Sequence, residues 1–452
     1  MSGPQTRPNA PSQGSGKLPE SLSPIANTPT AGPFFFGLHG GYQNAEALRK
    51  ASEAGAGSIR IYVEWAQLQH NEAYNTNNWL EPTALARLDG YIKNATAAGL
   101  RPILLIGEAP DYAAARPRGP LLPGKQEHFN RFVETLVTTY KAPPYNVKLW
   151  ELWPEPDAVG NQRDARRGAW GDNGAEFASM LKSTYPVIKR ADPEATVFIG
   201  ALALDWFADP GPGFNGGGIF RYTFVDDVLK NGGAAGFDVF AFNSYAAFAP
   251  GWEERAAGRD IAAKTNWVRA KLGEHGVSKP IMVLESGIWS AGQTVAVSGP
   301  GGQGLIDVPP SPEWQAAYVP RLFSRGLAAG LLGVSWYTLL DGEVNPIKYG
   351  LLAPNLTPKP AYTALSVTAQ KLRGSRFAGP PVGVIVAAGD VEGYRFDKAG
   401  TMVTALWALG GADATAMVRV PESVRVVDAL GRPVTPQNGE IKLTALAVFL
   451  EE

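Results

Sequence analysis

The feature that most constrains the fold of this chain is a regular alternation of short apolar runs with amphipathic segments between residues 34 and 375. The runs are rich in β-branched and aromatic residues, which is typical of strands, whereas the segments between them have helical periodicity. Strands that alternate with helices form a parallel sheet, because each helix carries the chain back to the start of the next strand. The eight predicted strands are Phe34–Leu38, Ser58–Val63, Arg101–Ile106, Val147–Trp153, Thr196–Ala201, Phe237–Asn243, Pro280–Glu285 and Gly333–Thr338.

Eight strand–helix units over about 340 residues favour a (β/α)8 TIM barrel over a doubly wound sheet. Nucleotide binding has little support, because Gly37–Gly41 after the first strand lacks the GxGxxG spacing and no GxxxxGK[ST] motif occurs. The longer segments predicted as crossover helices are Glu81–Ala98, Lys125–Tyr140, Ala175–Lys189, Asp260–His275, Pro312–Ala329 and Lys359–Leu372.

Two further regions flank the predicted barrel, which spans residues 34–375. Residues 1–33 are rich in Pro, Ser, Gly and Asn, a composition that predicts a disordered tether. No signal peptide is recognisable in it. Because such tethers often follow a removed targeting segment, we expect an extracellular or cell-surface bacterial protein. Residues 376–452 instead show short alternating strands separated by turn residues, which predicts a small antiparallel β-sandwich-like domain packed against the barrel.

Composition excludes several kinds of chemistry. The 41 basic and 42 acidic side chains leave a net charge of −1, which gives no field for capturing nucleic acid. There is no cysteine, and the four histidines form no HExxH pair, so we expect neither a metal nor an organic cofactor. The most apolar stretch, residues 326–340, is shorter than the roughly 20 residues that cross a bilayer. The expected partner is a neutral or mildly polar molecule, and the sequence says nothing about oligomeric state.

Two glutamates close predicted strands on opposite sides of the barrel mouth. The fourth strand runs into KLWELWPEPD at 148–157, which contains Glu155, and the seventh reads PIMVLESG at 280–287, which contains Glu285. Catalytic groups of such barrels lie at the carboxyl ends of the strands. Two carboxyl groups facing one substrate suit glycoside hydrolysis, in which one attacks and the other donates a proton. Apolar surroundings such as Trp153 would keep the acid protonated.

These segments resemble glycoside hydrolase clan A. WELWPEPD at 150–157 is similar to the clan's strand-four signature W-x-x-W-N-E-P-D, and VLESG at 283–287 is similar to its strand-seven nucleophile segment. The resemblance covers most of the chain. Residues 185–193, residues 349–362 and the small terminal β domain are most similar to the family 39 branch.

The resemblance implies a role for each matching residue. Glu155 would be the general acid and then base, and Glu285 the nucleophile. The segment SIRIYVEW is similar to the clan's second strand, whose arginine, here Arg60, supports the nucleophile. DVFAFNSY is similar to the sixth strand, whose tyrosine, here Tyr245, hydrogen-bonds the nucleophile. Trp336 matches the tryptophan that floors the sugar subsite.

One position departs from the clan pattern. The clan places an asparagine before the acid to bind the sugar 2-hydroxyl, and this chain has Pro154, which carries no donor. His39, Asn243 and Asn161 are possible substitutes. The substitution suggests a 2-modified sugar, an axial 2-hydroxyl, or reduced activity.

The sequence therefore predicts a retaining O-glycoside hydrolase that acts on an oligo- or polysaccharide by double displacement. Each residue also has a purely structural interpretation, such as an ion pair for Arg60 or core packing for Tyr245. One alternative is a carbohydrate-binding barrel that has lost catalysis because of Pro154. A second is a metal-dependent hydrolase or lyase that uses Glu64, Glu108 and His39.

Overall fold

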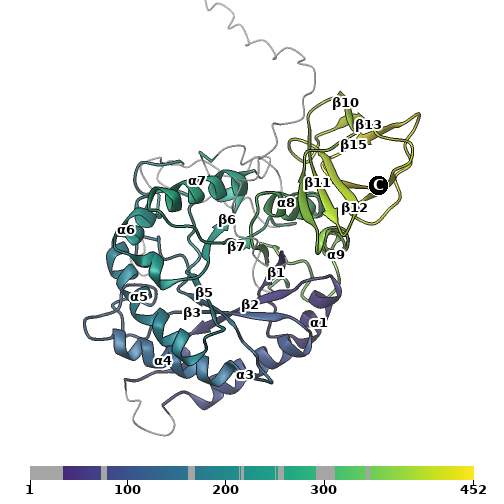
Figure 1. Cartoon of the computed structure of the whole chain (residues 1–452). Helices are drawn as coiled ribbons and strands as arrows, with labels where there is room; N and C mark the ends of the chain where they lie inside the picture. Colours follow the sequence, from purple (N-terminus) through teal and green to yellow (C-terminus); the bar gives the residue numbers. More distant parts are fainter. Residues whose placement is uncertain are drawn as a thin grey trace, which may run out of the picture.

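The computed structural model describes residues 34–72, 79–160, 168–212, 214, 218–249, 251–252, 259–291, 311–342 and 347–452. An eight-stranded parallel sheet curls into a barrel that helices surround, and antiparallel strands follow toward the C-terminus (Figure 1). The predicted fold class is confirmed; the predicted tether lies outside the described residues. The barrel strands are β1 (Phe35–His39), β2 (Ser58–Glu64), β3 (Arg101–Gly107), β4 (Leu149–Leu152), β5 (Thr196–Ile199), β6 (Phe240–Ser244), β7 (Ile281–Ser286) and β8 (Gly333–Tyr337).

The barrel closes less completely between β5 and β6 than elsewhere. The strand order is β5-β4-β3-β2-β1-β8-β7-β6, and neighbours in this order are joined by parallel ladders. Between β5 and β6 the described residues form only two isolated bridges, Phe198 with Val239 and Leu202 with Phe242. We call this place, where the ends of β5 and β6 face each other, the β5–β6 seam.

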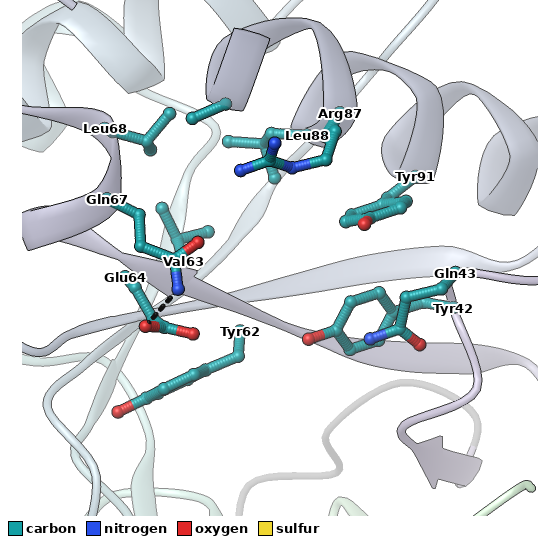
Figure 2. A pocket seen from close by; sticks show the side chains of 11 residues that line it. Tyr42, Gln43, Tyr62, Val63, Glu64, Gln67, Leu68, Arg87, Leu88 and Tyr91 are labelled. Atoms are coloured by element: carbon teal, nitrogen blue, oxygen red, sulfur yellow. Dashed lines mark hydrogen bonds between the residues drawn. The ribbon is translucent and has the colours of Figure 1, made fainter. Parts of the chain in front are cut away.

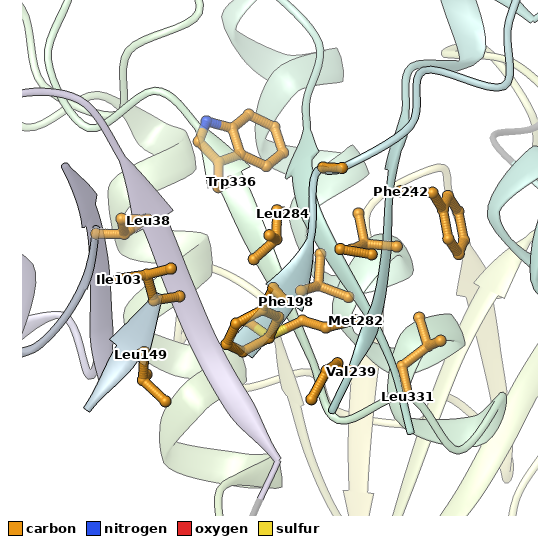
Figure 3. Close-up of a cluster of buried hydrophobic side chains, with 14 of the residues drawn as sticks. Leu38, Ile103, Leu149, Phe198, Val239, Phe242, Met282, Leu284, Leu331 and Trp336 are labelled. Carbon is orange, nitrogen blue, oxygen red and sulfur yellow. The ribbon is translucent and has the colours of Figure 1, made fainter. Parts of the chain in front are cut away.

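The barrel strands are apolar on both faces, because helices cover the outer face and side chains from the strands fill the interior. In β3, every residue from Pro102 to Gly107 is buried, which explains the continuous apolar run in the sequence. Figure 3 shows inward side chains from several strands in one cluster, among them Leu38, Ile103, Met282 and Trp336.

Nine α-helices lie in the described residues, and three of them, α1 (Ala45–Glu53), α2 (Trp65–Leu68) and α6 (Phe224–Lys230), were not among the predicted crossover segments. Ala45–Glu53 has only nine residues, although Ala47, Leu48 and Ala51 form a buried face and the Asn44 side chain caps the helix by accepting from two backbone N–H groups. No helix in the described ranges is long and apolar enough to span a membrane. The helices are α1 (Ala45–Glu53), α2 (Trp65–Leu68), α3 (Pro82–Ala97), α4 (Gln126–Tyr140), α5 (Gly174–Ala191), α6 (Phe224–Lys230), α7 (Asp260–Glu274), α8 (Pro312–Ala328) and α9 (Pro360–Leu372).

The C-terminal strands form two antiparallel sheets, ordered β14-β16-β12-β11-β9 and β10-β13-β15. They pack against α8, whose residues from Trp314 onward are all buried. Arg325 on α8 forms a buried bidentate pair with Glu392 at 2.8 and 2.7 Å, which confirms that this part packs against the barrel. The strands are β9 (Arg376–Gly379), β10 (Ile385–Ala388), β11 (Val391–Lys398), β12 (Thr401–Ala408), β13 (Ala416–Arg419), β14 (Arg425–Asp428), β15 (Glu440–Leu443) and β16 (Val448–Glu451).

Candidate active site

Glu155 lies in a sharply bent segment directly after β4. The backbone is left-handed at Trp153 (φ 76°) and at Glu155 (φ 38°), a conformation that costs free energy in residues with a side chain and is common at active sites. The backbone N–H of Glu155 donates to Ala201 O at 3.1 Å, which ties this bend to the end of β5. Gly200 permits the close approach, since a Cβ there would lie 2.1 Å from the Trp153 carbonyl oxygen.

Glu285, on β7, is held by two donors. Arg60 Nη1 donates to its Oε1, and the Tyr245 hydroxyl donates to its Oε2 at 2.9 Å. Burial favours the neutral acid, but the charge of Arg60 and these hydrogen bonds outweigh burial and lower the pKa of Glu285. The side chain is 18% exposed, so a ligand at the mouth can reach it. Glu285 is therefore an ionised and accessible carboxylate.

Glu151, on β4, is a residue of this site that sequence reasoning missed. It is fully buried and pairs with Arg60 through two hydrogen bonds of 2.6 and 2.7 Å, while Ala201 N donates to it at 3.0 Å. Arg60 thus donates through Nε and Nη2 to Glu151 and through Nη1 to Glu285. A carboxylate inside the apolar run LWEL was the signal in the sequence, because a buried charge requires a partner.

Glu155 has an environment opposite to that of Glu285. Burial, then the negative charges of Glu285 and Asp157, raise the pKa of Glu155 to about 7. Asn243 Nδ2 donates to Glu155 Oε1 at 3.0 Å and opposes this rise. A carboxylic acid with this pKa is largely protonated just below neutrality, and the structure brings it together with an ionised carboxylate at one barrel mouth.

His39, at the end of β1, contacts the same arginine. Its Nδ1 lies 3.0 Å from Arg60 Nη1. Because a guanidinium can only donate, Nδ1 accepts, and the neutral ring carries its proton on Nε2. Burial lowers the pKa of His39 to about 4, so the ring is neutral at physiological pH. Nε2–H is then a hydrogen-bond donor beside the carboxylates.

The two predicted tryptophans lie in different places. Trp153, two residues before Glu155, is buried, and its indole N–H donates to Arg118 O at 2.7 Å. Trp336, predicted to floor a sugar subsite, is fully buried and its indole N–H donates to Tyr349 O at 3.1 Å, so it presents no exposed surface to a ligand in this structure. The neighbouring Tyr337 is partly exposed, with its ring centroid 5.0 Å from that of His39. Of these two adjacent aromatic residues, only Tyr337 has exposed surface.

Pro154 is buried and packs against β3, where a Cβ on Gly107 would lie 2.7 Å from its Cδ. Of its three possible substitutes, Asn161 lies outside the described residues, and Asn243 already donates to Glu155. His39 Nε2–H is one available donor near this position, and Asn243 Nδ2 has a second N–H besides the one that binds Glu155.

A pocket of about 130 Å³ lies beside the carboxyl end of β2 (Figure 2). Tyr42, Tyr91, Gln67 and Arg87 line it, together with apolar residues of α2 and α3. Tyr62 also lines it and donates to Glu108 Oε1 at 2.9 Å. Its amides, tyrosines and charged groups are suited to polar, hydroxyl-bearing ligands.

The three residues of the metal-dependent alternative do not form one site. Glu64 accepts from Gln67, Glu108 accepts from Tyr62 and from Arg118, and His39 contacts Arg60. Within the described ranges, no group of three or more His, Asp or Glu side chains is arranged to hold a metal ion.

Comparisons with known proteins agree with this architecture. The sequence model of the family Cellulase (glycosyl hydrolase family 5) matches residues 24–216, which include β1 to β5 and Glu155. A search of curated proteins finds no match. A family 39 glycoside hydrolase from the gut symbiont Bacteroides cellulosilyticus superposes with a TM-score of 0.66 at 19% identity, covering 94% of this chain and 82% of that one.

Two further structures have the same fold. A monomeric β-xylosidase from Caulobacter crescentus has a TM-score of 0.61 at 15% identity, covering 93% of this chain and 97% of its own. A glucosidase from Croceicoccus marinus has a TM-score of 0.61 at 13% identity, covering 96% and 97%. The predicted resemblance to clan A, including its family 39 branch, is confirmed: the matching family model and the similar structures are glycoside hydrolases of these families.

Proposed function

We propose that this protein is a retaining O-glycoside hydrolase that cleaves an oligo- or polysaccharide by double displacement, with Glu285 as nucleophile and Glu155 as acid and then base. The observation that supports this most is the pair of opposite pKa shifts, lowered at Glu285 and raised to about 7 at Glu155. Two neighbouring carboxyl groups whose pKa values are separated in this way can divide attack and proton donation between them.

In the first step, a carboxylate oxygen of Glu285 attacks the anomeric carbon while the bond from that carbon to the leaving oxygen breaks. Glu155 donates its proton to the leaving oxygen, so the departing alcohol is neutral. Arg60 and Tyr245, which contact Glu285 in the resting site, hold it in position for attack. The products are a glycosyl ester on Glu285 and an ionised Glu155.

In the second step, the same residues act in reverse. Ester formation removes the negative charge of Glu285, which is the second-largest cause of the raised pKa of Glu155. The pKa of Glu155 therefore falls, and its carboxylate takes a proton from water as the water oxygen attacks the anomeric carbon. The ester bond breaks, Glu285 leaves as a carboxylate, and Glu155 is protonated again.

The absence of a side-chain donor at Pro154 restricts which sugar substrates we expect to be cleaved efficiently. We infer that the substrate has a modified or axial 2-hydroxyl, or that ordinary sugars are cleaved slowly, with His39 Nε2–H as a donor at the mouth. The solved structures named above include a β-xylosidase and a glucosidase, so aryl β-xylosides and β-glucosides are the first members of a test panel. Hydrolysis of an ordinary β-glucoside at full speed would contradict this inference.

Glu285→Gln and Glu155→Gln test the assignment. Removing the nucleophile abolishes turnover of every aryl glycoside, whereas removing the acid mainly affects substrates with poor leaving groups, because good ones depart without a proton. Glu64→Gln is the matched control, since Glu64 also ends a strand at the mouth but contacts Gln67. A fully active Glu285→Gln enzyme would refute the assignment. Proton NMR of the first product distinguishes retention from inversion.

A barrel that binds carbohydrate without cleaving it is the second candidate, favoured by Pro154 alone. It predicts that native protein retains a bound oligosaccharide with no new reducing ends over hours. Release of reducing sugar that is lost in Glu285→Gln excludes it.

We also propose an extracellular or cell-surface location in a bacterium, which immunodetection in fractionated cells would test.

A further inference from the structure

The open seam between β5 and β6 lies next to the proposed acid. Asn243, on β6, donates its backbone N–H to Leu202 O at 2.7 Å across the seam, and its side chain binds Glu155. Beside it, Leu202 N donates to Ala241 O at 3.1 Å, and the described residues form isolated bridges here rather than a continuous ladder. A side chain that binds both strand ends therefore adds to the few bonds that keep the Asn243 amide at 3.0 Å from Glu155.

Lys264, on α7, joins the two sides of this seam. Its ammonium group is fully buried and donates to Ala203 O at 3.3 Å on the β5 side and to Asn243 O at 3.2 Å on the β6 side. The third contact is an ion pair with Asp205. An ammonium group has three hydrogens, and each of them has one acceptor here.

The segment that Lys264 holds also supports the bend that carries Glu155. Ala201 O accepts from the Glu155 backbone, and Ala203 N and Leu204 N donate to the Asp157 carboxylate at 3.0 and 3.1 Å. The residues after β5 thus bind the segment that carries Glu155, while Asn243 binds the Glu155 carboxyl group. Lys264 is the one side chain that binds both supports in the described part of the chain.

We propose that Lys264 is a positioning residue for Glu155: by binding Ala203 O and Asn243 O across the β5–β6 seam, it holds the Asn243 amide against the Glu155 carboxyl group. This proposal rests on the proposed role of Glu155 as acid and base. Lys264 does not touch the reacting atoms; it acts through Asn243.

Lys264→Met removes the three donors while keeping a side chain of similar length. Once Asn243 is released, Glu155 loses a hydrogen bond that favours its ionised form, so its pKa rises by about one pH unit. The other charged groups that act on Glu155 are Glu285, Asp157, Arg118 and Asp205. Loss of the Lys264 charge makes Asp157 easier to protonate, which reduces the shift. It also leaves Asp205 without its ion-pair partner, so Lys264→Met with Asp205→Asn, which removes both charges, isolates the effect of releasing Asn243.

The pKa of Glu155 is measured in the resting enzyme by carbon NMR of protein labelled at the glutamate carboxyl groups, with Glu155→Gln to assign the signal. The lysine control is Lys359→Met, because Lys359 also binds three acceptors, Ser290 Oγ, Asp341 Oδ2 and Lys348 O, but none of them contacts Asn243. We expect the Glu155 titration to move upward in Lys264→Met and to stay in place in Lys359→Met.

An unchanged Glu155 titration in folded Lys264→Met overturns the proposal, as does an equal shift in the control. If Lys264→Met does not fold, Lys264→Met with Asp205→Asn replaces the buried pair by neutral groups, which is commonly tolerated. The same upward shift is expected there, and its absence has the same meaning. This measurement needs no turnover, so it is independent of the activity assays that test Glu155 as the acid.

Discussion

Replacing Tyr245 by Phe removes one of the two donors that keep Glu285 ionised, and the size of the effect follows from the contact. The lost hydrogen bond, 2.9 Å long and made to a charged acceptor, contributes about 1.5–3 kcal/mol, which corresponds to about 1–2 pH units in the pKa of Glu285. Because 18% of the Glu285 side chain is exposed, water replaces part of that bond, so we expect the lower end. The pKa of Glu285 rises.

The assay is the pH dependence of kcat/KM on an aryl glycoside with an activated leaving group. Activity requires ionised Glu285, so a raised pKa moves the acidic limb of the profile upward by about one pH unit. The basic limb, which reports protonated Glu155, stays in place because Glu285 is fully ionised there in both enzymes. Tyr349→Phe is the control, since Tyr349 packs against Tyr245 with ring centroids 6.1 Å apart, and no hydrogen bond from its hydroxyl to Glu285 is present. An unmoved acidic limb, or the same movement in the control, refutes the reasoning.

Three further predictions concern residues around the site. Glu151→Gln places an amide donor against a guanidinium donor and lowers the free energy of unfolding by about 3–5 kcal/mol in urea titrations; a loss below about 1 kcal/mol would contradict this. Arg325→Met has a similar cost because it leaves Glu392 buried and unpaired, and adding Glu392→Leu restores most of the stability, again read from urea midpoints. Tyr337→Ala raises KM about tenfold, about 1.4 kcal/mol, whereas Trp336→Phe lowers thermal stability and leaves KM unchanged; the reverse pattern would place Trp336 in the subsite after all.

Much of the barrel could be predicted because its strands are apolar on both sides. All eight predicted strand ranges overlap the observed ones, since a continuous apolar run requires no knowledge of which face is inside. Some short elements were not predicted. α6, at Phe224–Lys230, has a buried apolar face but only about two turns, and β9, at Arg376–Gly379, is an edge strand with largely exposed side chains, so each is too short or too exposed to stand out in the sequence.

The site was predictable only in part. Glu155 and Glu285 were recognisable because each follows an apolar run at the end where barrels place their chemistry. Glu151 and Lys264 were not, because a single charged residue in an apolar segment does not reveal its partner. Lys264 lies 21 residues from Asn243 and 59 from Asp205 in sequence, and only packing of α7 against the seam unites them.

From the sequence alone, this protein's fold class and the strand-end segments that carry Glu155 and Glu285 could be determined, because apolar periodicity and strand-end motifs are local properties of a chain. Which side chains face the mouth was decided by tertiary structure. The ladder between β6 and β7 shifts register at Asn243, and the ladder between β7 and β8 shifts before Ser286 pairs with Trp336. Such irregularities redirect the side chains that follow them, which no alternating pattern can anticipate.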